Sequence, residues 1–143
     1  DMPATITEKE LAILDKTSLL FLVATLEITS LKNTKSLLKT LQDINYDISK
    51  IKIILNKDMP DVGIDKASLE TGLGIPVYAT IPMDSILVQV SLNKGECFVL
   101  KSPASLISRT IIDVAEKLIG PGKKQVNTNK SAILRIKDLL FGS

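Results

Sequence analysis

The stretch Lys50-Ile-Lys-Ile-Ile-Leu-Asn-Lys-Asp58 decides the fold, because it joins a strand-length apolar run to a turn. Its β-branched residues favour an extended strand, and Asn56 is the first polar residue at the carboxyl end. In an open parallel sheet, ligands bind just beyond the carboxyl ends of the strands. The asparagine amide offers one acceptor and two donors, which suits the edge of a purine base. Asn56 therefore either reads a base or simply turns the chain.

Composition predicts one soluble globular domain. The chain has 143 residues, of which 45% are hydrophobic and 24% charged. Its most apolar window, residues 19–26, is too short to span a membrane. A net charge of +2 and 3% aromatic residues leave little for nucleic acid binding, so no nucleic acid partner is expected. The absence of histidine and the single Cys97 exclude disulfides, Cys/His zinc sites and Ser-His or Cys-His catalysis, and fit a cytoplasmic location.

Apolar patterning predicts alternating strands and helices. The uninterrupted apolar run 19–25 is typical of a strand in a parallel sheet that is covered on both faces. Further strands are expected over residues 50–56 and 75–81, the latter near a sheet edge because Pro76 and Pro82 interrupt and end it. Helices are expected after the capping box of Thr7 and Glu10, and after a cap at Ser30, and over residues 65–71, 83–92 and 104–119. The fold class is therefore α/β, a three-layer parallel sheet with helices on both faces.

The carboxyl-terminal part has a different composition. Residues 121–130 contain Pro, Gly, Lys and polar amides without a core pattern, which predicts a linker after a domain of residues 1–120. Residues 131–143 form a tail whose segment Ser131 to Phe141 predicts an amphipathic helix. A basic amphipathic helix at the end of a linker either lies in a membrane interface or packs on protein.

Five short motifs resemble the C-terminal half of the MinD/ParA ATPases when they are taken in order. They are Asp1-x-Pro3, the segment 23–31 (VATLEITSL), the segment 54–57 (ILNK), the segment 81–84 (IPMD) and the segment 93–95 (NKG). Within that family, Ser30-Leu-Lys-Asn-Thr-Lys35 resembles the helix start of the CpaE/TadZ branch, which serves assembly of Flp/Tad pili. The resemblance covers about residues 1–120.

The resemblance implies a dimerising ATP-binding switch with a P-loop NTPase fold. On this basis Asn56 is the adenine-reading residue, and Pro82 and Asp84 belong to the loop that closes over the base. Glu27 lies where members of the family reach toward the nucleotide of the partner, and Asp1 helps to hold Mg²⁺. Each also has a simpler interpretation: a turn or cap carboxylate for Asp1, a strand breaker for Pro82, a helix cap for Asp84 and solvent exposure for Glu27.

The chain departs from the family in one respect, because it has no Gly-rich loop with Lys and Ser/Thr that could cradle phosphates. We expect a fragment, or a degenerate stand-alone domain, that retains the base-reading side and does not hydrolyse ATP alone. The function expected from the resemblance is the adenine-side half of a switch that localises or assembles a Flp/Tad-type pilus or secretion machine. Expected partners are a second copy of the chain, pilus-assembly components and, through the tail, the inner face of the cell membrane. The alternatives are a non-enzymatic docking scaffold and a MinD/ParA-like division-site or partition ATPase.

Overall fold

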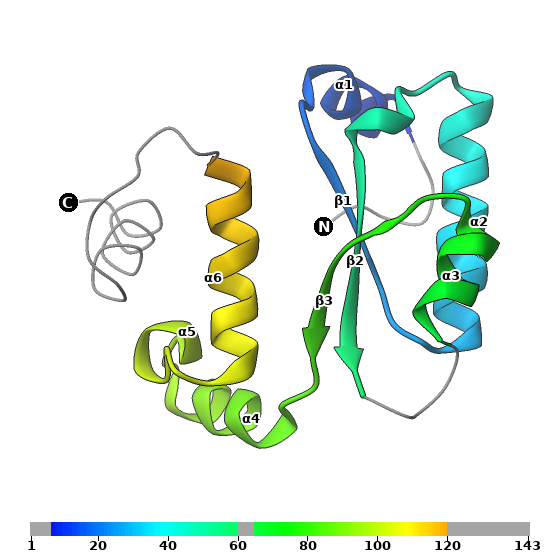
Figure 1. Ribbon diagram of the computed structural model, residues 1–143. Helices are drawn as coiled ribbons and strands as arrows, with labels where there is room; N and C mark the ends of the chain where they lie inside the picture. The colour runs from blue at the N-terminus through cyan, green and yellow to red at the C-terminus, as the bar shows by residue number, and fades with distance from the viewer. Residues whose placement is uncertain (1–6, 60–64, 120–143) are drawn as a thin grey trace. The chain divides into compact units, whose positions relative to one another are not determined.

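The computed structural model, which describes residues 7–59 and 65–119, contains a three-stranded sheet in the order β1-β2-β3 (Figure 1). The strands are β1 (Leu20–Ala24), β2 (Ile51–Asp58) and β3 (Val77–Pro82). β1 pairs with β2 in parallel, from Leu20 opposite Ile51 to Ala24 opposite Leu55. The arrows of β2 and β3 point the same way in Figure 1. The sheet is thus parallel, as predicted, and β1 and β3 lie at its two edges within the described residues.

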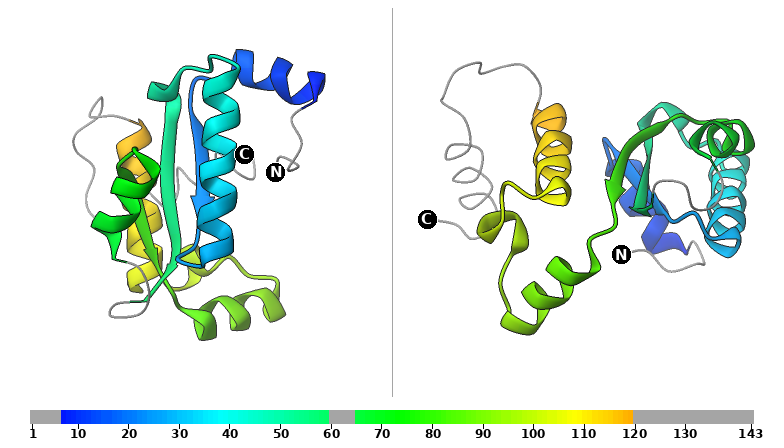
Figure 2. Two further views of the ribbon diagram at one scale, coloured as in Figure 1. Left: turned by 90° about the vertical axis from the view of Figure 1, so that its right-hand side faces the viewer. Right: turned by 60° about the horizontal axis from the view of Figure 1, so that its bottom comes forward.

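The chain divides into two units, and the boundary falls inside β3, after Thr80. The first unit holds β1, β2, most of β3 and three α-helices: α1 (Glu8–Lys16), α2 (Ile28–Asp43) and α3 (Lys66–Leu73). A short 3-10 turn, η1 (Ile48–Lys50), leads into β2. α2 and α3 cover the same face of this sheet (Figure 2).

Apolar side chains of the three helices and of the sheet form the core of the first unit. Leu14, Leu41, Ile53 and Leu55 are all at most 1% exposed. Further core residues come from the three strands, from α2 and α3, and from the segment before β3: Leu22, Leu38, Ile51, Leu69, Ile75 and Val77. Burial of such side chains stabilises the fold by about 1.5–3 kcal/mol each. Val23 of β1 lies on the opposite face and is 61% exposed.

Most helix ends follow the predicted chemistry. The Glu10 carboxylate accepts a 2.8 Å hydrogen bond from the backbone N–H of Thr7, as a capping box requires. α3 ends at Gly74, whose φ of 70° is the left-handed conformation that glycine adopts without strain. Asp65 caps the start of α3, and its hydrogen bonds from the Ser68 hydroxyl and N–H hold the pKa of Asp65 below its ordinary value of 3.8. Gly74, and not Gly72, is therefore the residue that closes this helix.

Several predicted boundaries are wrong by one to three residues, those of α2, β2 and the last described helix among them. α2 starts at Ile28, two residues before the expected cap at Ser30. The Ser30 hydroxyl instead accepts the N–H of Thr25 at 2.9 Å and so joins the end of β1 to the first helical turn. β2 continues to Asp58 instead of ending at Asn56. In the second unit, the last described helix starts at Leu106, two residues later than expected, because the Ser105 hydroxyl accepts the N–H of Ser108 at 3.3 Å in the manner of an N-cap.

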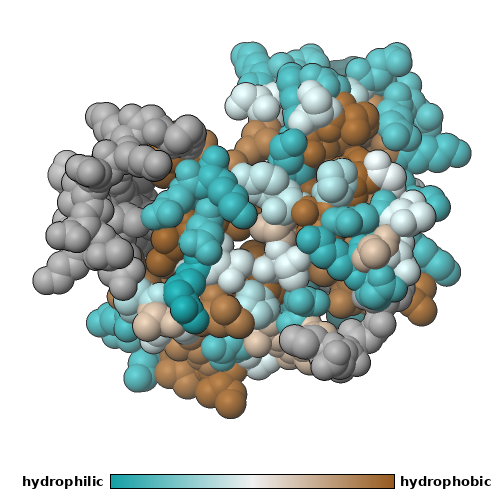
Figure 3. All heavy atoms as spheres, in the orientation of Figure 1, coloured by the Kyte–Doolittle hydropathy of each residue, from teal (hydrophilic) through white to brown (hydrophobic). Residues whose placement is uncertain are grey.

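The second unit contains α4 (Ser85–Lys94), α5 (Phe98–Lys101) and α6 (Leu106–Ile119). Ser108 of α6 is fully buried, and its hydroxyl donates to the Phe98 carbonyl oxygen of α5 at 3.4 Å, which links the two helices. The Ser108 hydroxyl also accepts a hydrogen bond from the Ser105 hydroxyl at 2.8 Å. Apolar side chains appear on the molecular surface over α4 (Figure 3). Among them Ile86 is 80% exposed and Leu92 is 70% exposed.

None of the helices among the described residues combines the length and apolarity needed to cross a membrane. The predicted linker of residues 121–130 and the predicted tail helix lie outside the described residues.

The Tyr46 hydroxyl leads to the first testable prediction. Its oxygen is buried without a hydrogen-bond partner in the described part of the chain, while its ring lies 5.8 Å from the Lys50 ammonium nitrogen. Burial, aided by the Asp47 carboxylate, raises the pKa of Tyr46. Because a buried unsatisfied hydroxyl destabilises the fold and Phe keeps the ring contact, Tyr46→Phe should raise the free energy of unfolding by about 1 kcal/mol.

Urea unfolding monitored by circular dichroism measures this change. Tyr46→Ala is the control, because it removes the ring and should destabilise by about 2 kcal/mol. A loss of stability in Tyr46→Phe would mean that the hydroxyl has a partner in solution.

Candidate functional site

The carboxyl ends of β1 and β2 lie at the same edge of the sheet. Ala24 and Leu55 form the last paired residues of the register, so Thr25 and Asn56 follow directly on the two strands. Both are half-buried, whereas the residues before them are buried at 1% exposure. The polar character of the chain therefore begins at one place on both strands, which is where parallel α/β folds bind ligands.

The Asn56 side chain is partly engaged with its own backbone. Its Oδ1 accepts a hydrogen bond from the Lys57 N–H at 2.9 Å. An amide oxygen has a second lone pair, and in the described part of the chain the amide NH₂ of Asn56 donates to no partner. The side chain is thus held in place by a local bond while one acceptor site and two donors remain for a ligand.

Lys57 explains why this local bond exists. Its φ of 57° places it in the left-handed region, which non-glycine residues rarely adopt. This conformation departs from extended backbone angles immediately after Asn56, although β2 continues to Asp58. The Asn56 oxygen satisfies the N–H of Lys57 at that point. Asn56 therefore holds its own backbone inside β2 and does not end the strand, and its base-reading role stays a prediction.

Glu27 lies at the same edge, three residues after the end of β1. It occupies the N-cap position of α2 with extended backbone angles, and its exposed side chain makes no capping hydrogen bond. A carboxylate at a helix N-terminus is favoured by the helix dipole. The structure thus brings Glu27 and Asn56 to one edge of the sheet, with Glu27 in the solvent-exposed state that is its simpler interpretation.

Pro82 and Asp84 belong to the second unit, and Asp1 lies outside the described residues. Pro82 is the last residue of β3 and is half-buried. Asp84 is the N-cap of α4, where its Oδ1 accepts the N–H of Leu87 at 3.0 Å. The predicted helix-cap role of Asp84 is therefore confirmed, and its place in a loop over a base stays a prediction.

The described residues contain no group of three or more His, Cys, Asp or Glu side chains that could hold a metal ion. The one residue predicted to support Mg²⁺, Asp1, lies outside residues 7–59 and 65–119. The Mg²⁺ role of Asp1 stays a prediction.

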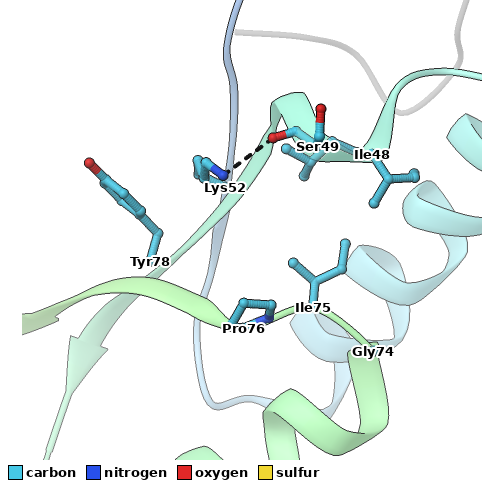
Figure 4. A pocket seen from close by; sticks show the side chains of 8 residues that line it. Ile48, Ser49, Lys52, Gly74, Ile75, Pro76 and Tyr78 are labelled. Carbon is cyan, nitrogen blue, oxygen red and sulfur yellow. Dashed lines mark hydrogen bonds between the residues drawn. The ribbon is translucent and has the colours of Figure 1, made fainter.

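A separate hollow of about 290 Å³ lies at the opposite end of β2. Figure 4 shows Lys52 between Tyr78 and Ser49, with Ile75 and Pro76 facing them from the segment before β3. The Lys52 ammonium donates to the Ser49 carbonyl oxygen at 3.3 Å. Because this hollow begins at the amino end of the strand, it is distinct from the edge that carries Asn56.

Sequence reasoning missed two residues of the carboxyl edge, Thr25 and Ser30. Thr25 is the first polar residue after the apolar run of β1, which is the same signal that identified Asn56. The Ser30 hydroxyl, expected as a cap, holds the Thr25 N–H instead. The left-handed backbone of Lys57 carries no sequence signal, because it has neither the glycine nor the asparagine that usually marks such a position.

A parallel sheet flanked by helices, with polar residues following adjacent strands, defines the class of α/β proteins that bind ligands at the carboxyl edge. Similarity to known structures narrows this class of α/β proteins further. A ParA family ATPase from Chlorobium tepidum matches with a TM-score of 0.71 and 32% sequence identity, over 78% of this chain and 46% of that one. The predicted resemblance to the MinD/ParA ATPases and the predicted fold class, that of a P-loop NTPase domain, are thereby confirmed. The closer resemblance to the CpaE/TadZ branch stays a prediction.

Two MinD structures show the same fold. MinD in the MinC:MinD cell division complex of Aquifex aeolicus matches with a TM-score of 0.67 and 18% identity, over 85% of this chain and 51% of that one. The septum site-determining protein MinD of Pyrococcus horikoshii, complexed with Mg-ADP, matches with a TM-score of 0.66 and 22% identity, over 87% and 52%. The chain therefore spans about half the length of the structures it matches. No protein-family model matches the chain, and no curated protein sequence matches it either.

The backbone of Lys57 provides a test of the site geometry. Because a β-branched side chain clashes in the left-handed region, Lys57→Val should lower the free energy of unfolding by about 1–2 kcal/mol. Lys57→Gly should leave it unchanged or raise it by up to about 1 kcal/mol. Urea unfolding of both variants measures the difference.

Lys52→Val is the matched control, because Lys52 lies in the extended part of the same strand, where valine is favoured. Equal stability of Lys57→Val and Lys57→Gly would contradict a left-handed backbone at Lys57.

Proposed function

We propose that this chain supplies the adenine-side half of a dimerising ATP-dependent switch of the ParA/MinD type. The observation that carries the proposal is Asn56, a half-buried amide at the carboxyl end of a buried parallel strand, with its NH₂ free of partners among the described residues. Asparagine pairs with adenine by donating to N7 and accepting from the N6 amino group. The Asn56 amide has its NH₂ available to donate to N7, and its oxygen has a second lone pair available to accept from the N6 amino group.

The comparisons support a nucleotide as the ligand. The Chlorobium protein, at 32% identity, is described as an ATPase, and the Pyrococcus MinD structure holds Mg-ADP. In our proposal Pro82 and Asp84 close over the base, Glu27 reaches toward the nucleotide of a second copy, and Asp1 supports Mg²⁺. These residues bind and orient the nucleotide, while residues that cradle the phosphates would have to come from outside residues 1–143.

We further propose that the switch serves a Flp/Tad-type pilus or secretion machine. The support is the segment 30–35, which resembles the CpaE/TadZ branch and forms part of the first half of α2. The partners would be a second copy of the chain and pilus-assembly components, with the tail of residues 131–143 contacting either the membrane or protein.

Nucleotide binding by the full-length protein tests the adenine assignment. Asn56→Ala removes both the acceptor and the donors, whereas Asn56→Asp keeps an oxygen for the Lys57 N–H and loses only the donors. If Asn56 reads adenine, both variants should weaken ATP binding by about tenfold or more, because each loses the bond to N7. Isothermal titration calorimetry measures the dissociation constants, with urea unfolding run beside it.

Two other results would be informative. If Asn56→Asp binds ATP as the wild type does and only Asn56→Ala is impaired, the residue serves the turn alone and the adenine assignment fails. If the wild-type protein binds no nucleotide, the alternative of a non-enzymatic docking scaffold replaces the switch. A GTP titration is the matched control, because guanine presents O6, an acceptor, in place of the N6 donor.

The proposed role in pilus assembly predicts a cellular phenotype. Cells that carry Asn56→Ala in the full-length protein should lose most surface pili, counted by electron microscopy, while division-site placement stays normal. Misplaced septa with normal pili would instead support a MinD-like role, and plasmid or chromosome loss would support a ParA-like role. An immunoblot for equal protein levels is the control.

A further inference from the structure

A groove of about 240 Å³ lies between α2 and α3 in the first unit, and its lining starts at Ile28, the residue after Glu27. We call it the α2–α3 groove. α2 contributes Ile28, Leu31, Lys32 and Lys35, and α3 contributes Gly72 and Leu73 among others. The four residues of α2 have the spacing i, i+3, i+4, i+7, which places them on one face of the helix. The groove is therefore a continuous surface and not a gap at a loop.

The floor of the groove is apolar and partly uncovered. Leu31 and Leu73 are half-buried and pack against the core of the unit. Ile28 is 65% exposed, although it belongs to the first turn of a helix whose other apolar residues face the core. Covering an exposed aliphatic surface stabilises a complex because that apolar surface is removed from water. The groove thus offers binding energy to an apolar side chain.

The rim of the groove is basic. Lys32 and Lys35 stand one turn apart on α2, and Lys39 follows on the next turn. Neither Lys32 nor Lys35 forms an ion pair with any residue that the structure describes. Glu70 of α3 is engaged with Lys66, at an N–O distance of 3.8 Å. A ligand that brings carboxylates to this rim would find cations with no competing partner among the described residues.

We propose that the α2–α3 groove binds an acidic amphipathic helix of a partner protein. Its leucine-type side chains would pack on Ile28, Leu31 and Leu73, and its carboxylates would face Lys32 and Lys35. Amphipathic helices bind hydrophobic grooves through apolar residues at i, i+3, i+4 and i+7. Opposite charges at the rim mainly accelerate association and select the partner.

Charge and shape favour an acidic helix over two other possible occupants of the groove, the chain's own tail and a lipid surface. The chain's own tail of residues 131–143 is basic in sequence, because it contains Arg135 and Lys137 but a single acid, Asp138, and like charges would oppose its binding here. A lipid surface suits a protruding apolar face, whereas this floor lies between two helices. An acidic amphipathic helix matches both features, because its apolar side chains suit the floor and its carboxylates suit the basic rim.

A pair of synthetic peptides tests the charge requirement on the full-length protein. Both are long enough to form a helix and carry leucines at i, i+3, i+4 and i+7, and their flanking residues are glutamates in one and lysines in the other. By fluorescence anisotropy the glutamate peptide should bind about tenfold or more tightly than the lysine peptide. The double variant Lys32→Glu/Lys35→Glu should reverse this preference. Lys9→Glu is the control, because Lys9 is an exposed lysine of α1 that does not line the groove.

Gly72 allows a second test that does not change charge. A Cβ added at Gly72 would meet no atom within 4 Å, so the position accepts a side chain without a clash. Gly72→Leu should fill the groove and abolish binding of the glutamate peptide, while Gly72→Ala should leave it open. Both substitutions favour the helix over glycine, so thermal unfolding should show no loss of stability.

Three results would overturn the proposal. The first is unchanged binding of the glutamate peptide in both Gly72→Leu and the double lysine variant. The second is loss of self-association in the double variant by analytical ultracentrifugation, without any peptide binding by the wild type, which would make a second copy the occupant. The third is that the wild-type protein floats with phosphatidylserine vesicles, that the Lys32→Glu/Lys35→Glu variant does not, and that neither peptide binds. This result would make a membrane the occupant of the groove.

Discussion

The parallel pairing of β1 with β2 is the constraint on which the first unit depends. Five consecutive residue pairs, from Leu20 with Ile51 to Ala24 with Leu55, hold the two strands in register. A parallel pair requires the chain to return to the starting end of the sheet, and α2 makes that return while covering the core face. The same pairing aligns the carboxyl ends of both strands. The core and the candidate site are thus consequences of one register.

Sequence patterns predicted the order and type of these elements well, because the signals were long or chemically specific. The apolar runs of β1 and β2, the capping box at Thr7 and the glycine after α3 each reflect a physical requirement that the structure confirms. A helix boundary was mispredicted where a serine hydroxyl oxygen could accept a hydrogen bond from more than one backbone N–H. Ser30 was expected to cap a helix, but its oxygen accepts a backbone N–H from the preceding strand end.

The candidate site was predictable in position and only partly in geometry. The first polar residue after a buried strand identifies Asn56, and the resemblance in its surroundings is supported by 32% identity to a ParA family ATPase over 78% of the chain. The bond from Asn56 to the Lys57 N–H depends on a positive φ at a lysine, which residue type does not indicate. The α2–α3 groove likewise depends on how far apart two helices lie, and no spacing within either helix determines that distance.

The position of β1 has a consequence for handling the isolated chain. Within the described sheet its outer edge presents backbone N–H and C=O groups that pair with no strand, beside the exposed Val23. Such an edge is a template for β-pairing with any other extended chain. Aggregation of the isolated chain should therefore increase with protein concentration, and the net charge of +2 provides little electrostatic repulsion against it. A strand that paired with this edge of β1 would block its pairing with other chains and so protect the sheet from aggregation.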